Sequence, residues 1–153
     1  MELIQKAKTT DVKTIYKLVR KTIKSLYPYY YPKGAVNFFL NHHSIENITK
    51  DVIDGNAYVL ILDEKIIGTV TINENEINRF FVLPSFQHKG YGTKLFVFAE
   101  EYIRNKNFTS IMLHASFVAK QMYLNLGYKE IEYRTKETDN KDFLCVDIME
   151  KVL

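Results

Sequence analysis

Hydrophobic positions in the first third of the chain recur at the spacing of an α-helix. One helical face carries Val12, Ile15, Tyr16, Val19 and Ile23. This helix is expected to begin after Thr10 or Asp11, either of which can cap it, and to end near Pro28. A second helical region follows, with Val36, Phe39 and Leu40 as its apolar face, and a third short helical piece is expected over residues 44–52.

The pattern becomes strand-like after residue 56. Strands are predicted at residues 58–62, 66–72 and 76–83 as an antiparallel meander, after a first strand at 3–7. Next come a helix at 92–105, a buried strand at 110–114, a helix at 117–126, and terminal strands at 128–133 and 143–149. The order β-α-α-β-β-β-α-β-α-β-β predicts an α/β fold, with a mixed sheet of the α+β kind and helices on both faces.

The composition indicates a globular protein of one domain, residues 1–153. Hydrophobic residues make up 46% of the 153 and charged residues 25%, which excludes a disordered or fibrous chain. The net charge of +3 comes from Lys and Arg scattered among acids, without the basic stripe that nucleic acid requires. We therefore expect no nucleic-acid partner, and the small positive excess suits a small anionic cofactor equally well.

The cysteine count and the apolar runs narrow the class of protein further. Cys145 is the only cysteine, so no intramolecular disulfide can form, and no metal site is expected. The N-terminal residues 1–6 lack the apolar core of a signal peptide, and no run is long and apolar enough to cross a membrane. A cytoplasmic location without a membrane partner is expected.

The segment 78–95 carries the most informative motif, a strand followed by a Gly-bearing loop and the start of a helix. Unpaired N–H groups at such a helix start suit phosphate oxygens, and Gly90 and Gly92 let the backbone approach an anion closely. Lys89 adds a positive charge. Taken alone, the motif fits a plain structural turn as well as an anion site. It is neither a Walker A loop nor a complete dinucleotide fingerprint.

Two spaced motifs give the chain a family resemblance. Gln87, Gly90 and Gly92 match Gln/Arg-x-x-Gly-x-Gly/Ala, and Val82-Leu83-Pro84 supplies the Val-x-Pro that precedes it. Downstream, Ala119, Tyr123 and the pair Gly127-Tyr128 match a second pattern at the same spacing. Over essentially its whole length the chain resembles the GNAT superfamily of acyl-CoA N-acetyltransferases.

The resemblance implies a GNAT-like fold, a mostly antiparallel central sheet with a splayed parallel strand pair, and acetyl-CoA as cosubstrate. In the family, the main chain near Phe80 and Val82 pairs with the pantetheine arm, and amides of the glycine loop hold the pyrophosphate. Ser116 stands where the family often has Asn. The implied cofactor-binding residues are Phe80, Val82, Gln87, His88, Lys89, Gly90, Tyr91, Gly92, Thr93 and Ser116.

The resemblance also implies catalytic groups. Tyr123 matches the tyrosine that donates a proton or a hydrogen bond to the coenzyme A sulfur; the alternative is a core aromatic on an amphipathic helix. The main-chain N–H of Val82 is the implied donor to the acetyl carbonyl. Glu76 stands where many relatives carry a carboxylate that deprotonates the amine, directly or through water. Its alternative is an exposed carboxylate at a strand entrance.

The acceptor side is less defined. Tyr29 and Tyr30 lie in an aromatic cluster where the family places its acceptor loop, and they either wall the amine site or pack on the core. His43 is the third candidate for substrate binding, and neighbouring helical positions prevent His42 and His43 from serving one site together. The expected reaction is acetyl transfer to a primary amine of a small molecule in a ternary complex. Acetylation of a protein N-terminus or lysine, and a non-catalytic acyl-CoA-binding module, remain alternatives, as do monomer and homodimer.

Overall fold

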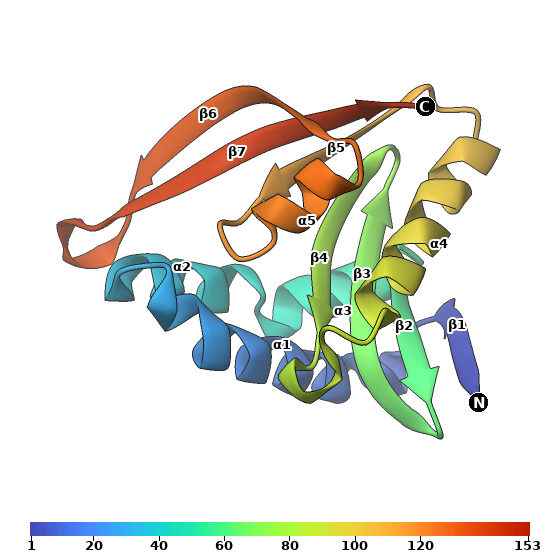
Figure 1. Ribbon diagram of the computed structural model, residues 1–153. Helices are drawn as coiled ribbons and strands as arrows, with labels where there is room; N and C mark the ends of the chain where they lie inside the picture. Colours follow the sequence, from blue (N-terminus) through green and yellow to red (C-terminus); the bar gives the residue numbers. More distant parts are fainter.

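A seven-stranded sheet forms the frame of the molecule (Figure 1). The computed structural model describes all residues, 1–153. The strands run in the order β1-β2-β3-β4-β5-β7-β6, and every neighbouring pair is antiparallel except β4 and β5. Their bounds are β1 Glu2–Lys6, β2 Ala57–Leu62, β3 Lys65–Asn73, β4 Glu76–Val82, β5 Ser110–Ala115, β6 Lys129–Glu137 and β7 Phe143–Val152.

Five α-helices flank this sheet: α1 Val12–Leu26, α2 Lys33–His42, α3 Ile45–Ile53, α4 Tyr91–Asn105 and α5 Lys120–Asn125. The predicted mixed fold is confirmed, but three helices, not the two of the predicted order, lie between β1 and β2. The short piece expected at 44–52 is a complete helix capped by Ser44, whose hydroxyl accepts from the Asn47 N–H at 3.1 Å. Asp11 does not cap α1 with its side chain, which accepts from the Lys8 N–H one turn earlier. The terminal strands extend three or four residues beyond their predicted ends.

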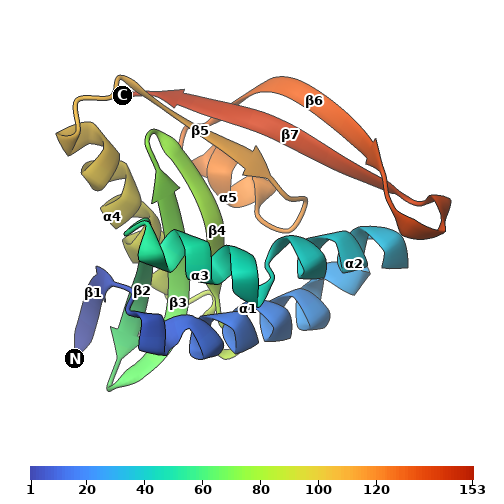
Figure 2. The same ribbon diagram turned by 180° about the vertical axis from the view of Figure 1, so that it is seen from behind.

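Two hydrophobic cores lie on opposite faces of the sheet (Figures 1 and 2). Helices α1, α2 and α3 cover one face, where Ile15 and Val19 pack in the same core as Phe81 of β4. Helices α4 and α5 cover the other, where Leu95 and Phe96 belong to one core with Leu113 of β5. Helices therefore cover both faces of the sheet, as predicted, and the site is formed by the strands between them.

Strands β4 and β5 separate soon after they meet. The only registered pair between them is Glu76 with Met112, whose N–H donates to Asn75 at 3.0 Å. A bulge then shifts the β3–β4 register, and Arg79 takes a left-handed conformation with φ 43°. The edge of β4 beyond Glu76 therefore has no strand partner on the β5 side, which creates an opening in the middle of the sheet.

The hairpin of β6 and β7 overhangs the helical layer and touches it at α2 (Figure 1). The Gly34 N–H in the first turn of α2 donates to Asp142 Oδ2 at 2.8 Å. The approach is so close that a Cβ at position 34 would lie 2.0 Å from the Asp139 carbonyl oxygen. Only glycine permits this contact, which closes one end of the space between the hairpin and α2.

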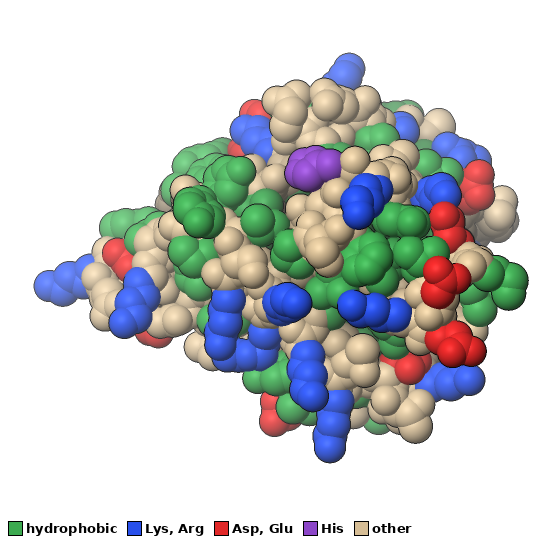
Figure 3. All heavy atoms as spheres, turned by 60° about the horizontal axis from the view of Figure 1, so that its bottom comes forward, with side chains coloured by type: hydrophobic (Ala, Val, Ile, Leu, Met, Phe, Trp, Pro, Cys, Tyr) green, Lys and Arg blue, Asp and Glu red, His purple; other side chains and the backbone are tan.

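The solvent face of α1 is basic. Lys13, Lys17, Lys21 and Lys24 are exposed, none forms an ion pair, and residues 12–45 contain neither Asp nor Glu. Figure 3 brings this underside forward and shows Lys and Arg side chains across its middle, with acidic ones mainly toward its edges. Charge is thus less evenly mixed than the sequence analysis assumed. No helix in the structure has the length and apolar character needed to span a bilayer.

Candidate active site

A cavity of about 950 Å³ lies at the opening between β4 and β5. It draws its walls from β4, the glycine loop, the start of α5, helices α1 to α3, and the β6–β7 hairpin. Most of the predicted site residues meet on this one cavity. Those that line it are Glu76, Phe80, Val82, Gln87, His88, Gly90, Gly92, Thr93, Ser116, Tyr123 and His43.

The end of β4 presents free backbone groups to this cavity. Because the Leu83 N–H donates to Ile67 on β3, the alternation of the ladder turns the N–H and C=O of Val82 toward the β5 side. The Val82 carbonyl accepts from Gln87 Nε2 at 2.8 Å. The Gln87 side chain thus fixes the strand end, and the Val82 N–H points into the opening.

The glycine loop leads directly into α4. Gly90, the residue before the helix, has φ 89°, and a Cβ there would meet no atom within 4 Å, so the loop approaches open space. The first intrahelical bond runs from the Lys94 N–H to the Gly90 oxygen, so the N–H groups of Tyr91, Gly92 and Thr93 have no backbone acceptor. Such a helix start suits phosphate oxygens. The Lys89 and Tyr91 side chains lie outside the cavity lining.

Tyr123 reaches the cavity from α5. Its side chain is 7% exposed and packs 5.4 Å from the Phe96 ring and 6.2 Å from the Tyr128 ring, centroid to centroid. Its hydroxyl forms no hydrogen bond within the protein. Burial, with a smaller contribution from Tyr27, raises the pKa of the Tyr123 phenol well above its ordinary value. The phenol therefore stays protonated and is available as a donor.

Glu76 and His114 form a pair where β4 and β5 begin to separate. The Glu76 Oε1 and His114 Nε2 atoms lie 3.8 Å apart, and both side chains are partly open to solvent. They come from adjacent strands, so the sheet itself holds them together. The pair places a carboxylate and an imidazole on the lining of the cavity that the glycine loop also reaches.

The tyrosines that face the cavity are not the ones expected from the sequence. Tyr29 and Tyr30, predicted to bind substrate, are 85% and 53% exposed and do not line the cavity. Tyr27 lines it instead, with its ring 4.9 Å from that of Phe39. Tyr31 is buried, and its hydroxyl accepts from the Phe117 N–H at 2.7 Å. The 3₁₀ turn Tyr27–Tyr29 turns the central rings outward and the flanking rings inward.

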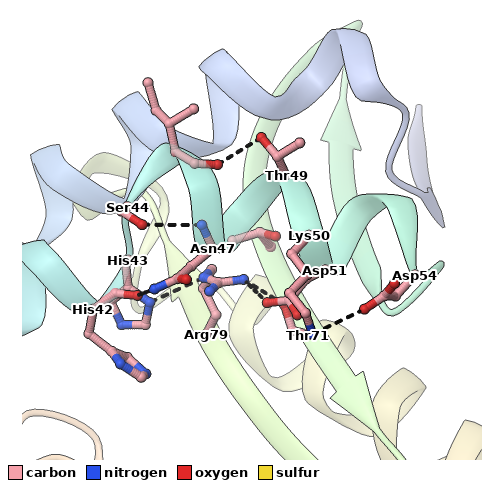
Figure 4. Close-up of polar contacts among 12 residues, drawn as sticks. His42, His43, Ser44, Asn47, Thr49, Lys50, Asp51, Asp54, Thr71 and Arg79 are labelled. Carbon is pink, nitrogen blue, oxygen red and sulfur yellow. Dashed lines mark hydrogen bonds and ion pairs between the residues drawn. The ribbon is translucent and has the colours of Figure 1, made fainter.

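A buried polar network forms the floor beside α3 (Figure 4). Arg79 Nε donates to His43 Nδ1 at 3.1 Å, while Nη1 contacts the Asp51 carboxylate and Thr71. Burial, together with Arg79 and His42, lowers the pKa of His43 to about 2, so its ring is neutral. Arg79 was not among the predicted site residues, because its position depends on a bulge that no residue pattern indicates.

Comparison with known proteins agrees with this geometry. Residues 27–151 match the model of the acetyltransferase (GNAT) domain. A spermidine N(1)-acetyltransferase of Thermoplasma acidophilum is 25% identical over 97% of this chain and 95% of its own length.

Solved structures show the same fold. A GCN5-related N-acetyltransferase from Rhodopseudomonas palustris aligns with a TM-score of 0.90 at 15% identity, covering 100% of this chain and 96% of its own. The PaiA N-acetyltransferase of Thermoplasma acidophilum, solved with coenzyme A, aligns with a TM-score of 0.76 at 21% identity, covering 100% and 99%. With the family match spanning most of its length, the chain belongs to the GNAT acetyltransferases, acyltransferases that use acetyl-CoA.

Proposed function

We propose that this chain transfers the acetyl group of acetyl-CoA to the primary amine of a small molecule, by direct attack in a ternary complex. The observation that carries the proposal is the single cavity that joins the free edge of β4 and Tyr123 with Glu76 and the aromatic wall of Tyr27. Both substrates thereby have access to one point of the sheet, as direct transfer requires.

The residues present fit coenzyme A. The unpaired N–H groups of Tyr91, Gly92 and Thr93 at the start of α4 are placed to hold the pyrophosphate. The open edge of β4 around Phe80 and Val82 offers backbone groups to an extended pantetheine arm. When bound, acetyl-CoA supplies the activated acetyl group, and the Val82 N–H is oriented to stabilise the carbonyl oxygen where negative charge develops.

Tyr123 is assigned to the leaving sulfur. Its raised pKa lies far above the value of about 8.5 typical of a thiol, so complete proton transfer to a thiolate is unfavourable. The hydroxyl therefore acts by donating a hydrogen bond to the sulfur as charge builds there. Glu76 is assigned to the amine, whose proton it accepts directly or through water, with His114 beside it.

A small acceptor is favoured by the contact between the β6–β7 hairpin and α2. This contact, through Gly34 and Asp142, closes one end of the acceptor space, which leaves less room for an extended polypeptide. The spermidine N(1)-acetyltransferase similarity supports an amine acceptor in general terms.

Replacing Tyr123 with Phe tests the proposal. Turnover, measured as release of the coenzyme A thiol across a panel of amines, is expected to fall by about tenfold or more, while acetyl-CoA affinity stays nearly unchanged. Tyr30→Phe, at an exposed ring outside the cavity, is the matched control and should keep the full rate. A Tyr123→Phe enzyme with undiminished turnover would show that the hydroxyl has no catalytic role.

A further inference from the structure

We propose that the amine acceptor also carries a carboxylate, and that Arg79 and His43 bind this carboxylate on the cavity floor. The inference rests on the proposed function, since it specifies the acceptor of that same reaction. It comes from hydrogen-bond donors that the protein leaves unused.

Arg79 is held rigidly but incompletely satisfied. Its side chain is 6% exposed, with Nε bonded to His43 and Nη1 bonded to Asp51 and Thr71 (Figure 4). Nη2 has no partner in the protein, yet it is not sealed from solvent space, and Arg79 lines the cavity. One nitrogen of a fixed guanidinium therefore remains available to an oxygen ligand.

His43 supplies a second donor. Because its Nδ1 accepts from Arg79, the neutral ring must carry its proton on Nε2. That N–H has no partner in the protein, and His43 is 7% exposed and lines the same cavity. The low pKa of His43, caused mainly by burial, keeps this tautomer across the physiological range. Two neighbouring groups thus offer donors only, a pattern that a carboxylate with its two acceptor oxygens matches.

The charges around the cavity point the same way. Its lining contains Lys50, Arg79, Arg134 and Lys136 but only the carboxylates Asp51 and Glu76. Two of these cations are paired with carboxylates outside the lining, Lys50 with Asp54 and Arg134 with Glu132. Asp51 is occupied by Arg79, whereas Lys136 has no ion-pair partner and holds its Nζ 4.5 Å from the centroid of the Phe38 ring.

These cations affect the pKa of His42. Burial is the main cause of its lowered pKa, and Arg79 and Lys136 are the next largest. Arg79 on the floor and Lys136 on the hairpin wall therefore both disfavour a positive charge on His42, and Asp51 opposes them by a smaller amount. A polyamine would find one carboxylate there that no Lys or Arg occupies, Glu76, while an amine with a carboxylate would find partners for both of its groups.

Matched acids and amides test this inference. The thiol-release assay compares L-phenylalanine with L-phenylalaninamide and 4-aminobutyrate with 4-aminobutanamide, with spermidine as a polycation. In at least one pair the acid is expected to exceed its amide in kcat/KM by about tenfold, and to exceed spermidine, because burying an unmatched set of donors costs that much. Amides or spermidine acetylated as well as both acids would overturn the proposal.

A binding measurement separates this failure from failure of the proposed function. Calorimetry on the protein saturated with coenzyme A compares 3-phenylpropionate and butyrate, which have no amine, with their amides. Tighter binding of either acid than of its amide would support the carboxylate site. If at the same time no amine releases thiol, the acetyl transfer is contradicted and the carboxylate site is not. Equal binding of acids and amides overturns the site.

Two substitutions assign the effect to residues. Arg79→Lys keeps a cation beside Asp51 but loses the nitrogen that faces the cavity, so it should lower the kcat/KM of the acid more than that of its amide and reduce the acid preference to less than threefold. Lys141→Met removes an exposed cation outside the cavity and should change neither. If Arg79→Lys folds, as judged by its melting temperature, and keeps the full preference, the assignment is wrong.

If Arg79→Lys does not fold, Lys136→Met decides the question. Lys136 has no ion-pair partner, so the protein should tolerate its loss. We expect the KM of the preferred acid to rise about threefold more than that of its amide, since a solvent-screened charge attracts a carboxylate only weakly. An unchanged KM for the acid would contradict the inference.

Discussion

His43 is a neutral group buried beside the Arg79 guanidinium, and this affects the stability of the fold. Its pKa falls from an ordinary value of 6.5 to about 2 on folding, mainly through burial. Between these values the unfolded chain binds a proton that the folded chain excludes, so stability is complete above pH 6.5 and declines as the pH falls. The slope is roughly 1.4 kcal/mol per pH unit. Urea unfolding of wild type at pH 7, 6 and 5 should show this contribution, and His43→Phe should lack it.

The comparison uses slopes because the variant also leaves Arg79 Nε without an acceptor. Phe at position 43 preserves an aromatic ring against Phe81, whose centroid lies 5.2 Å away. His88→Gln, which removes an exposed imidazole, is the control and is expected to keep the wild-type slope. Equal slopes in wild type and His43→Phe would mean that the imidazole is not buried as a neutral group.

The residues of the site differ in how far the sequence could predict them. Motif spacing fixes the places of Gln87, Gly90 and Tyr123 on a loop and a helix, and all three line the cavity. Arg79 was missed because its inward direction depends on a bulge and a positive φ, which are set by the pairing of β3 with β4. The sequence placed aromatics at the acceptor side but could not tell which of them the 3₁₀ turn directs inward, and the structure selects Tyr27.

At the scale of elements, the contact between α2 and the β6–β7 hairpin is the one most open to a single substitution. In Gly34→Ala the added Cβ would lie 2.0 Å from the Asp139 oxygen, so the backbone must move. Overpacking of this kind costs about 1–3 kcal/mol, which lowers the melting temperature of a protein this size by roughly 2–12 °C. Calorimetric unfolding measures the change.

Gly34→Ala should also affect one substrate more than the other. The hairpin carries the acceptor wall, including Lys136 and Val146, whereas the glycine loop and α4 lie at a distance from it. The KM for the amine should therefore rise while the KM for acetyl-CoA stays near its wild-type value. Lys33→Ala, at the exposed neighbouring position, is the control. A normal melting temperature in Gly34→Ala would mean that the hairpin does not rest on α2.

The bounds of helices and strands were predicted well where the element has one buried face, and poorly where it has none. Helices α1 and α4 have clear apolar faces, and their bounds lie close to those expected. Strand β6 was predicted to end at residue 133 but continues to Glu137, because every residue in it is exposed and only its pairing with β7 maintains it. Helix α5 begins at Lys120, after a turn in which the Phe117 N–H donates to Tyr31.

For the whole molecule, the two cores on either side of the sheet explain how the site persists. Each core is built from one helical layer and one face of the sheet, and β5 is paired along its length with β7 instead of β4. The gap can therefore remain open without loss of the hydrophobic contacts that stabilise the fold. Sequence order predicted this layering, whereas the extent of the splay depends on contacts between distant segments.

Charge at the whole-molecule scale leads to the last prediction. Helix α1 lies on the same underside of the molecule as the loop that leads into α4 (Figure 1), and acetyl-CoA is a multiply charged anion. A positive face beside a binding site raises the association rate of an anion at low salt, and the effect weakens as the Debye length falls below about 10 Å.

The triple variant Lys13→Gln, Lys17→Gln, Lys24→Gln should bind acetyl-CoA several-fold more slowly at 20 mM salt, with kcat unchanged and rates that converge with wild type at 500 mM. Replacing Lys106, Lys129 and Lys141 with Gln removes equal charge from other surfaces, so stopped-flow rates that fall equally in both variants would attribute the effect to net charge instead of the α1 face.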